Sequence, residues 1–456
     1  MIQTRNPATG EILNEYQSLS DQKIEEVLYL GHRAFFDWRD TTWLQRAQKF
    51  KALAVVLRAN QSELARSITC EMGKPINEAL QEVEKCATCC EYYGDQPEEW
   101  LADQMLLEKS PRVYVSPQPL GLILGIMPWN FPLWQVIRFA TPTLLAGNTV
   151  ILKHAPNTWG TALALAHCFK AAGFPLGVYQ DFPIEVAASN KVIADARVRG
   201  VSLTGSTQAG RLVAEQAGRH LKRCVLELGG SDPCVILADA DLDLAASKSI
   251  HSRMINAGQS CIAAKRLIVE EKVYDVFLAK IQDQLKDYIM GYPEQKTCKL
   301  GPLARQDLRD QLSEQVRQAQ QQGANCILKI DNPAPNKNGF YYPATLLTEV
   351  TENSVAFKEE LFGPVVTVVR AKDEKHAVRL ANATSYGLGA AIFSRDSQRA
   401  ERLARHELNA GLCVINGLVR SDPRWPFGGT KDSGYGRELT RYGAQEFVNL
   451  KTIVVD

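Results

Sequence analysis

One carboxylate and one thiol form a pair that could carry out covalent chemistry. Glu227 opens the run Glu-Leu-Gly-Gly, and Cys261 closes the later run Asn-Ala-Gly-Gln-Ser-Cys. Glycines in such turns let a backbone approach a substrate closely. A thiolate can add to a carbonyl, and a nearby carboxylate can deprotonate the water that releases an acyl group. The residues alone leave this open, because Cys261 is one of eleven cysteines and Glu227 could belong to a buried ion pair.

The elements around this pair follow an α/β pattern. We expect a strand at residues 233–237 and a helix at 242–254 between the two residues. Upstream, strands are predicted at 122–127, 149–153, 178–182 and 200–203, and helices at 157–172 (capped by Asn157), 185–195 and 211–218. Such alternation predicts a parallel, doubly wound sheet, and its return from residue 266 onward predicts a second α/β domain.

The first hundred residues are predicted to be mainly helical. Helical periodicity covers residues 21–38, 42–57, 61–72 and 76–93. The last helix carries Cys86, Cys89 and Cys90, which could bind a metal or cycle between redox states. Four ligands are normally needed and no second cluster exists, so buried free thiols are the favoured interpretation. Residues 331–339 are predicted to form a surface loop.

Composition narrows the class of protein. At 456 residues the chain is expected to fold as two or more domains, and 45% apolar with 23% charged residues fits a globular protein. A net charge of +1 without a basic block gives no reason to expect a nucleic-acid partner. Residues 1–5 lead straight into a turn, so no secretory leader is expected. With eleven scattered cysteines, we expect a cytoplasmic protein.

The most apolar segment is not expected to enter a membrane. It covers residues 120–152, and prolines, Asn130 and Arg138 interrupt it. A membrane-spanning helix needs about 20 consecutive, mostly apolar residues.

A glycine turn follows the strand predicted at residues 200–203. From Gly205 to Gly210 it reads Gly-Ser-Thr-Gln-Ala-Gly and leads into the helix predicted at residues 211–218. Free backbone N–H groups at such a place can bind a pyrophosphate. The spacing differs from the common dinucleotide fingerprint, so by itself the turn could equally be structural.

Several motifs together resemble the aldehyde dehydrogenase superfamily, and the resemblance covers nearly the whole chain. They are the two turns of Glu227 and Cys261, the Gly-Ser-Thr-x-x-Gly turn, Pro-Trp-Asn-Phe-Pro at 128–132, Glu-Glu-Leu-Phe-Gly-Pro at 359–364, and the glycine-rich segment 426–438. The resemblance implies a Rossmann-type cofactor domain, a second α/β catalytic domain and a small β oligomerisation element. It also implies oxidation of an aldehyde to an acid with NAD or NADP.

The resemblance assigns roles to the catalytic residues. Cys261 becomes the nucleophile, Glu227 the base, and Asn130 a neutral donor to the oxyanion, although an asparagine in such a turn could also cap a backbone group. Relatives that transfer the acyl group to coenzyme A tend to lack the glutamate. Hydrolysis to a free acid is therefore expected.

The resemblance also implies a set of cofactor-binding residues. They are Trp129, Lys153, Gly205, Ser206, Gly210, Leu228, Glu360 and Phe362. In the family the lysine and Glu360 contact the two riboses, and Phe362 packs beside the nicotinamide. Apart from the resemblance, Lys153 and Glu360 would pass as solvated charges. Pro156 replaces a glutamate found in many NAD-preferring relatives, so NADP stays possible.

The predicted substrate residues are Arg138, Ser421 and Phe427. Arginine occurs at the first of these places in succinate semialdehyde dehydrogenases, where its guanidinium can pair with a distal carboxylate. Ser421 matches a serine with the same role in those enzymes. A second expected arginine is missing, because Ile255 stands there. Arg138 could instead form a structural salt bridge.

The resemblance points to succinate semialdehyde as substrate. Two alternatives remain: a dehydrogenase for another small aliphatic or amino aldehyde, and a catalytically silent homologue.

The same resemblance implies a division into parts. Residues 1–100 and 120–229 are expected to bind the dinucleotide, and residues 230–440 to form the catalytic domain. Residues 101–119 and 441–456 would form the oligomerisation element of a homodimer or homotetramer. Within it, the strands predicted at 107–118 and 449–455 could also be an ordinary edge hairpin.

Overall fold

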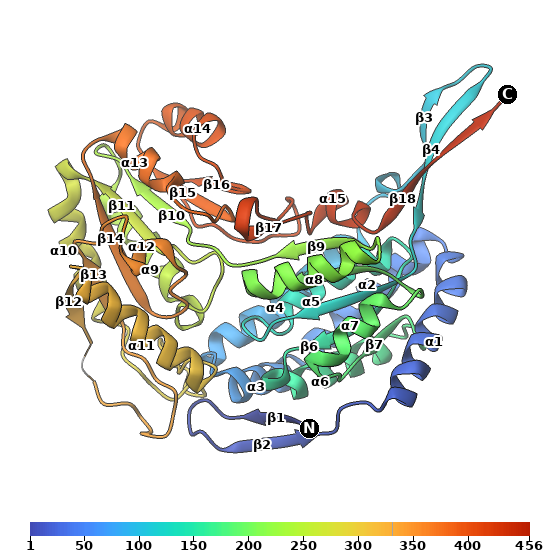
Figure 1. The fold of residues 1–456 in the computed structure, drawn as a ribbon, viewed down its shortest axis with the longest axis horizontal. Helices are drawn as coiled ribbons and strands as arrows, with labels where there is room; N and C mark the ends of the chain where they lie inside the picture. Colours follow the sequence, from blue (N-terminus) through green and yellow to red (C-terminus); the bar gives the residue numbers. More distant parts are fainter. Residues whose placement is uncertain (331) are drawn as a thin grey trace.

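The computed structural model describes residues 1–330 and 332–456. Two α/β units lie side by side, and a narrow β element projects from one of them (Figure 1). Residues 332–339 contain no helix or strand, as predicted for that loop, whereas Asp331 lies outside the described residues. Among the described residues, none of the helices combines the length and apolarity that crossing a bilayer requires.

The N-terminal segment forms a hairpin followed by four helices. These elements are β1 (Ile2–Arg5), β2 (Ile12–Tyr16), α1 (Asp21–Arg39), α2 (Trp43–Ala59), α3 (Gln61–Met72) and α4 (Ile76–Gly94). Side-chain oxygens start the first two helices: Ser20 accepts a hydrogen bond at the start of α1, and Thr42 forms a capping box with Gln45 at the start of α2.

The first large sheet has six strands in the order β17-β9-β8-β5-β6-β7. They are β5 (Leu122–Met127), β6 (Thr149–His154), β7 (Tyr179–Asp181), β8 (Val198–Thr204), β9 (Arg223–Glu227) and β17 (Gly434–Tyr435). All pairings are parallel except that of β17 with β9. The strand order reverses at β5, and such a switch point opens a crevice at the carboxyl ends of the strands.

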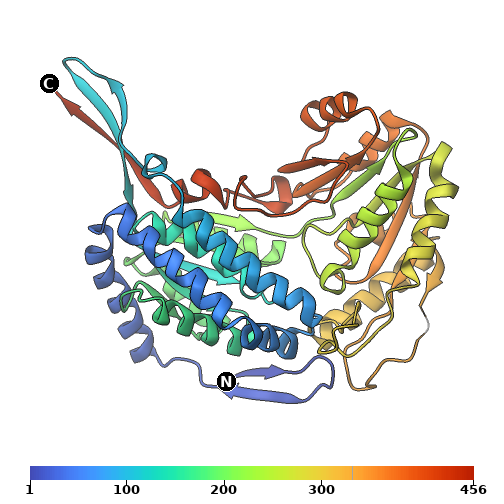
Figure 2. The same ribbon diagram turned by 180° about the vertical axis from the view of Figure 1, so that it is seen from behind.

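Helices cover both faces of this sheet. They include α5 (Trp134–Leu145), α6 (Trp159–Ala171), α7 (Val186–Ala194) and α8 (Thr207–Arg219). The apolar faces of α1, α7 and α8 meet one side of the sheet, and those of α2 to α6 meet the other. Figure 2 shows the second layer from its outer side.

The second large sheet has seven strands in the order β12-β13-β14-β11-β10-β15-β16. They are β10 (Pro233–Ile236), β11 (Arg266–Glu270), β12 (Asn325–Lys329), β13 (Thr345–Thr348), β14 (Val365–Ala371), β15 (Gly389–Phe393) and β16 (Leu412–Ile415). Only β12 is antiparallel to its neighbour. The helices of this unit are α9 (Leu242–Met254), α10 (Tyr274–Leu285), α11 (Gln306–Gln321), α12 (Val355–Lys358), α13 (Glu374–Asn382) and α14 (Ser397–His406).

The projecting element is a three-stranded antiparallel sheet. It contains β3 (Gln104–Leu107), β4 (Arg112–Pro119) and the final strand β18 (Val448–Val455), which pairs with β4 along its whole length. Large apolar side chains on it are exposed, including Met105, Leu107 and Leu450. The short helix α15 (Thr440–Gln445) precedes the last strand.

The predicted fold class is confirmed: a doubly wound α/β unit, a second α/β unit and a small β element are all present. Two helix starts were wrong. Helix α8 begins at Thr207, inside the predicted glycine turn, rather than at residue 211. Asn157 lies in a 3-10 turn, and α6 begins at Trp159 without a side-chain cap. Helix α5 was not predicted at all. All twelve of its residues are buried, so it has no polar face to reveal a helical period.

Candidate active site

The predicted catalytic residues meet at the carboxyl edge of the first sheet. Asn130 follows β5, Gly205 follows β8, and Glu227 ends β9. Because β5, β8 and β9 are parallel neighbours, their ends open on the same side. Cys261 reaches this edge from the turn that follows α9 in the second unit.

A cleft of 570 Å³ joins these segments. Its walls include the following predicted residues: Trp129, Asn130, Gly205, Ser206, Leu228, Cys261, Glu360 and Phe362. Lys153 and Gly210 do not line it. Gly210 instead lets α8 pack on the β9 turn, because a Cβ there would lie 2.5 Å from Leu228. Lys153 is a buried residue of β6, and burial lowers the pKa of its ammonium.

Glycines allow the turns to touch each other. A Cβ on Gly230 would lie 2.8 Å from the backbone oxygen of Cys261, and one on Gly229 would lie 2.5 Å from Glu360. A Cβ on Gly258 would lie only 2.2 Å from the backbone oxygen of Gly363. Larger residues at these three places would therefore push three segments apart: the base turn (residues 227–230), the nucleophile turn (256–261) and the cofactor loop (359–364).

The turn that carries the nucleophile is held in an unusual conformation. Asn256 and Ala257 have φ values of 57° and 51°, which L-residues adopt rarely. Arg253, fully buried on α9, donates to the backbone oxygens of Gly258, Leu361 and Val365 and so ties the turn to β14. The network compensates for the local strain.

Lys265 anchors the same turn from its other end. Its Nζ donates to the backbone oxygens of Ser260 and Cys261, at 2.8 and 2.7 Å, and lies 3.1 Å from a carboxylate oxygen of Glu360. Glu360 also accepts a hydrogen bond from the backbone N–H of Gly230. Lys265 thus joins the nucleophile turn to Glu360, and Glu360 in turn joins the base turn.

The side chain of Asn130 points at the nucleophile turn. Its amide nitrogen donates to the backbone oxygen of Gln259 over 3.1 Å, and its own backbone oxygen accepts from Lys74 and Asn256. An amide nitrogen carries two N–H groups, so one remains for an oxyanion. The geometry is compatible with the predicted role.

Burial shifts the pKa of both reacting groups upward. Burial raises the pKa of the Cys261 thiol to about 12, against a smaller lowering effect of Lys265 and Arg138. Burial, with the negative charge of Glu438, holds the pKa of Glu227 well above its ordinary value. Neither carboxylate oxygen of Glu227 has a hydrogen-bond partner among the described residues.

This raised thiol pKa predicts how the free enzyme reacts with an alkylating agent. Thiolate is the reactive form, and below the pKa its fraction grows about tenfold per pH unit. We therefore expect iodoacetamide to modify Cys261 slowly at pH 7 and progressively faster up to pH 10, as measured by mass spectrometry of its peptide. A rate that levels off below pH 9 would contradict this.

The aromatic residues predicted near the nicotinamide lie together. The rings of Trp129 and Phe362 meet edge to face with centroids 5.8 Å apart, at the wall of the cleft. Cys261 lines the same cleft. They form an apolar wall for a flat ring.

None of the three predicted substrate residues lines the cleft itself, although Arg138 donates to the hydroxyl of Thr204, which does. Arg138 on α5 is buried and forms an ion pair with Glu438, and its guanidinium also lies 4.6 Å from the ring centroid of Phe427. This is the structural salt bridge that the sequence left open. Ser421 is buried, and its hydroxyl oxygen accepts from Trp134 at 2.8 Å and from Lys85 at 3.1 Å.

Comparison with known proteins agrees with this geometry. The profile of the aldehyde dehydrogenase family matches residues 1–453. The chain belongs to the aldehyde dehydrogenase family. The family resemblance inferred from the motifs is thereby confirmed.

Bacterial succinate semialdehyde dehydrogenases resemble the chain over nearly its full length. It is 45% identical over 451 residues to the NAD(P)+ succinate semialdehyde dehydrogenase Sad of Escherichia coli, covering 99% of this chain and 97% of that one. It is 42% identical over 456 residues to an NADP+ succinate-semialdehyde dehydrogenase of Mycobacterium avium, covering 99% and 96%. The succinic semialdehyde dehydrogenase of Streptococcus pyogenes, solved with NADP+ as the cofactor, superposes with a TM-score of 0.96 at 35% identity over 99% of both chains.

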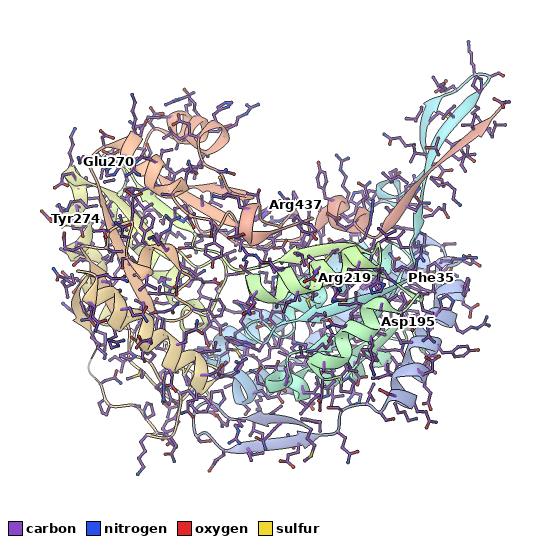
Figure 3. All side chains as sticks on the ribbon, in the orientation of Figure 1. Phe35, Asp195, Arg219, Glu270, Tyr274 and Arg437 are labelled. Carbon is purple, nitrogen blue, oxygen red and sulfur yellow. The ribbon has the colours of Figure 1, made fainter. Side chains whose placement is uncertain are left out.

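Within this aldehyde dehydrogenase, sequence reasoning missed the charged residues that hold the site. Arg253 and Lys265 were not recognised as anchors, nor Glu438 as the partner of Arg138. Isolated charges give no local signal, since their partners lie far along the chain. Figure 3 labels Arg437, the neighbour of Glu438, on the segment that crosses between the two units. Its guanidinium donates to the backbone oxygens of Gly429 and Gly436.

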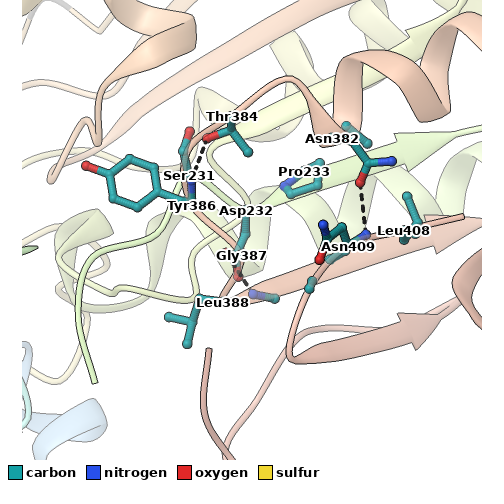
Figure 4. A pocket seen from close by; sticks show the side chains of 14 residues that line it. Ser231, Asp232, Pro233, Asn382, Thr384, Tyr386, Gly387, Leu388, Leu408 and Asn409 are labelled. Carbon is teal, nitrogen blue, oxygen red and sulfur yellow. Dashed lines mark hydrogen bonds between the residues drawn. The ribbon is translucent and has the colours of Figure 1, made fainter. Parts of the chain in front are cut away.

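A second cavity lies behind the cleft but is too small for a ligand. Figure 4 shows it between β10 and the loop after α13, and its volume is about 10 Å³, roughly one water molecule. Asp232 faces it, accepts a hydrogen bond from the backbone N–H of Gly389, and has a pKa raised by burial to about 7. This carboxyl fastens β15 to the start of β10.

Proposed function

We propose that this enzyme oxidises succinate semialdehyde to succinate with NADP or NAD. The observation that carries the proposal is the shared cleft: Cys261, Asn130 and the glycine turn at Gly205 line it, and Leu228, directly after Glu227, lines it as well. Nucleophile, oxyanion donor, base turn and phosphate-binding turn are thereby within one site.

The reaction begins at Cys261. Its thiolate adds to the aldehyde carbon, a C–S bond forms, and the carbonyl oxygen becomes an alkoxide that the free N–H of Asn130 can stabilise. The bound nicotinamide supplies the hydride acceptor for this carbon. What remains on Cys261 is a thioester. Glu227 removes a proton from water, the hydroxide adds to the thioester, and the C–S bond breaks to give the carboxylic acid and the Cys261 thiolate that starts the next cycle; Glu227 passes its proton to solvent.

The cleft fits a dinucleotide. The first N–H groups of a helix have no partner within the helix. Among the described residues, the hydroxyl of Ser206 accepts from the N–H of Ala209. Thr207 and Gln208 line the cleft beside Gly205, where their N–H groups can hold a pyrophosphate. Trp129 and Phe362 offer the apolar wall for the nicotinamide, and Glu360 can accept hydrogen bonds from its ribose.

The neighbourhood of Pro156 supports use of NADP. This residue is exposed and brings no carboxylate to a ribose phosphate. It lines a groove of 920 Å³ in which Arg5, Arg305, Arg309 and Lys337 outnumber Glu11 and Asp307, the last of which pairs with Arg305. Positive charge near a 2′-phosphate is favourable, whereas a glutamate there would repel it.

A substrate panel tests the proposal. We expect kcat/KM for succinic semialdehyde to exceed that for butanal by about 100-fold, because a buried charge-assisted pair contributes this much binding. NAD(P)H formation at 340 nm would be followed with each aldehyde and each cofactor. Equal efficiency for the two aldehydes would reject the substrate assignment, and no turnover of either would reject the enzyme.

The division into parts and the assembly complete the proposal. Residues 1–100 and 120–229 would bind the dinucleotide, residues 230–440 would carry the nucleophile, and residues 101–119 with 441–456 would join subunits into a homodimer or homotetramer. The exposed apolar side chains of the projecting sheet support an interface there. We place the enzyme in the cytoplasm, because all eleven cysteines are free and a reducing compartment keeps them so.

A further inference from the structure

Lys85 is a cation that the protein itself leaves without a counter-charge. It lies on α4, and its ammonium sits 4.0 Å above the ring of Trp134 and 3.1 Å from the hydroxyl of Ser421. No carboxylate among residues 1–330 and 332–456 comes within ion-pair distance of it. Glu82, the carboxylate whose charge acts on Lys85, is already paired with Lys74.

The surroundings of Lys85 favour an incoming anion. Burial lowers the pKa of its ammonium to about 8, and the positive charge of Arg138 adds to this effect. A carboxylate placed beside the ammonium would relieve both costs. Arg138 is a weaker candidate for this contact, since it already pairs with Glu438.

The hydroxyl proton of Ser421 also favours a bound carboxylate. A hydroxyl has two acceptor lone pairs and one donor. Trp134 and Lys85 donate to the oxygen of Ser421 and thereby occupy both lone pairs. The described residues provide no acceptor for the hydroxyl proton, and the side chain is buried. A buried hydroxyl without an acceptor is costly, and a carboxylate oxygen would satisfy it.

We propose that Lys85 and Ser421 together bind the distal carboxylate of the aldehyde substrate. Lys85 would supply the positive charge that is missing because Ile255 stands where a second arginine was expected. The ammonium would supply the charge and the hydroxyl a directed hydrogen bond. Trp134 holds both groups: its ring lies under the ammonium and its N–H donates to the hydroxyl. This inference rests on the proposed function, because it names the residues that select a carboxylated aldehyde.

The variant Lys85→Met tests the assignment. Methionine keeps an unbranched apolar stem against Trp134 but removes the charge. We expect KM for succinic semialdehyde to rise about 30-fold, with kcat changed less than twofold, while both constants for butanal stay within twofold. Lys85→Arg keeps the charge and should recover most of the affinity. Lys191→Met, which removes an exposed lysine of α7, serves as the control and should change neither substrate.

The outcomes separate this inference from the proposed function. If the unmodified enzyme does not prefer succinic semialdehyde over butanal, the proposed function fails. If it does prefer it and Lys85→Met keeps that preference, the assignment of Lys85 is overturned while the function stands. An equal loss for both aldehydes would show that Lys85 only supports the fold, and it would overturn the assignment as well.

Discussion

Replacing Cys261 by alanine is expected to abolish aldehyde oxidation. No other thiol lines the cleft beside Asn130 and the turn of Gly205, so nothing in the described structure can take over the attack on the carbonyl. Removing a covalent nucleophile typically costs about 10⁴-fold or more in kcat. NADPH formation from succinic semialdehyde would report the loss. Cofactor binding, followed by quenching of protein fluorescence, should remain, because the walls of the cleft are unchanged.

Cys326→Ala is the matched control for this experiment. Cys326 is also a free, partly exposed thiol, but it lies on β12, at the far edge of the second sheet. Its loss should leave kcat unchanged. Substantial turnover by Cys261→Ala would remove the thiol from the mechanism.

Replacing Glu227 by glutamine is expected to stop the second half of the reaction. The carboxyl is buried without a hydrogen-bond partner among the described residues, so an amide of the same size can occupy its place. An amide cannot take a proton from water, and loss of a general base typically costs about 10²- to 10⁴-fold. A rapid burst of NADPH equal to one per site should remain, followed by slow turnover. Mass spectrometry should then find the succinyl group on Cys261.

The pH dependence gives an internal control for Glu227. Because its pKa is raised, the base form is scarce at low pH and increases as pH rises. Thioester hydrolysis by the unmodified enzyme should therefore accelerate with pH, whereas Glu227→Gln should lose that dependence. Undiminished hydrolysis in the variant would mean that another group acts as the base.

Sequence patterns predicted the helices and strands that have a clear apolar periodicity and are bounded by capping, glycine or proline residues. The bounds of α3, α9 and β5 agree residue for residue, since each has an apolar stripe or run and well-defined ends. Helix α5 was not predicted, because its residues are apolar on every side and Pro142 lies inside it. The start of α6 was misplaced because Asn157, a good capping residue, was preferred over the 3-10 turn that Pro156 initiates.

The residues of the candidate site were predictable where they belong to a recognisable motif and not elsewhere. Residues in motifs, such as Asn130 and Cys261, were predicted and lie in one cleft. Lys85 was not, because a lysine on an amphipathic helix has the pattern of a solvated charge. The burial of Arg138 against Glu438 could not be predicted, since the two residues are distant in sequence and only the fold brings them together.

The pairing of β17 with β9 has a consequence for how the enzyme is made. Gly434 lies opposite Glu227 itself, and Gly428 approaches its carboxylate, so the surroundings of the base come from the last thirty residues of the chain. Residues 428–435 must therefore be packed against β9 before the base is enclosed, although about 200 residues separate the two segments along the chain. A substitution that loosens this contact, such as a larger residue at Gly434, should affect thioester hydrolysis more than the attack by Cys261.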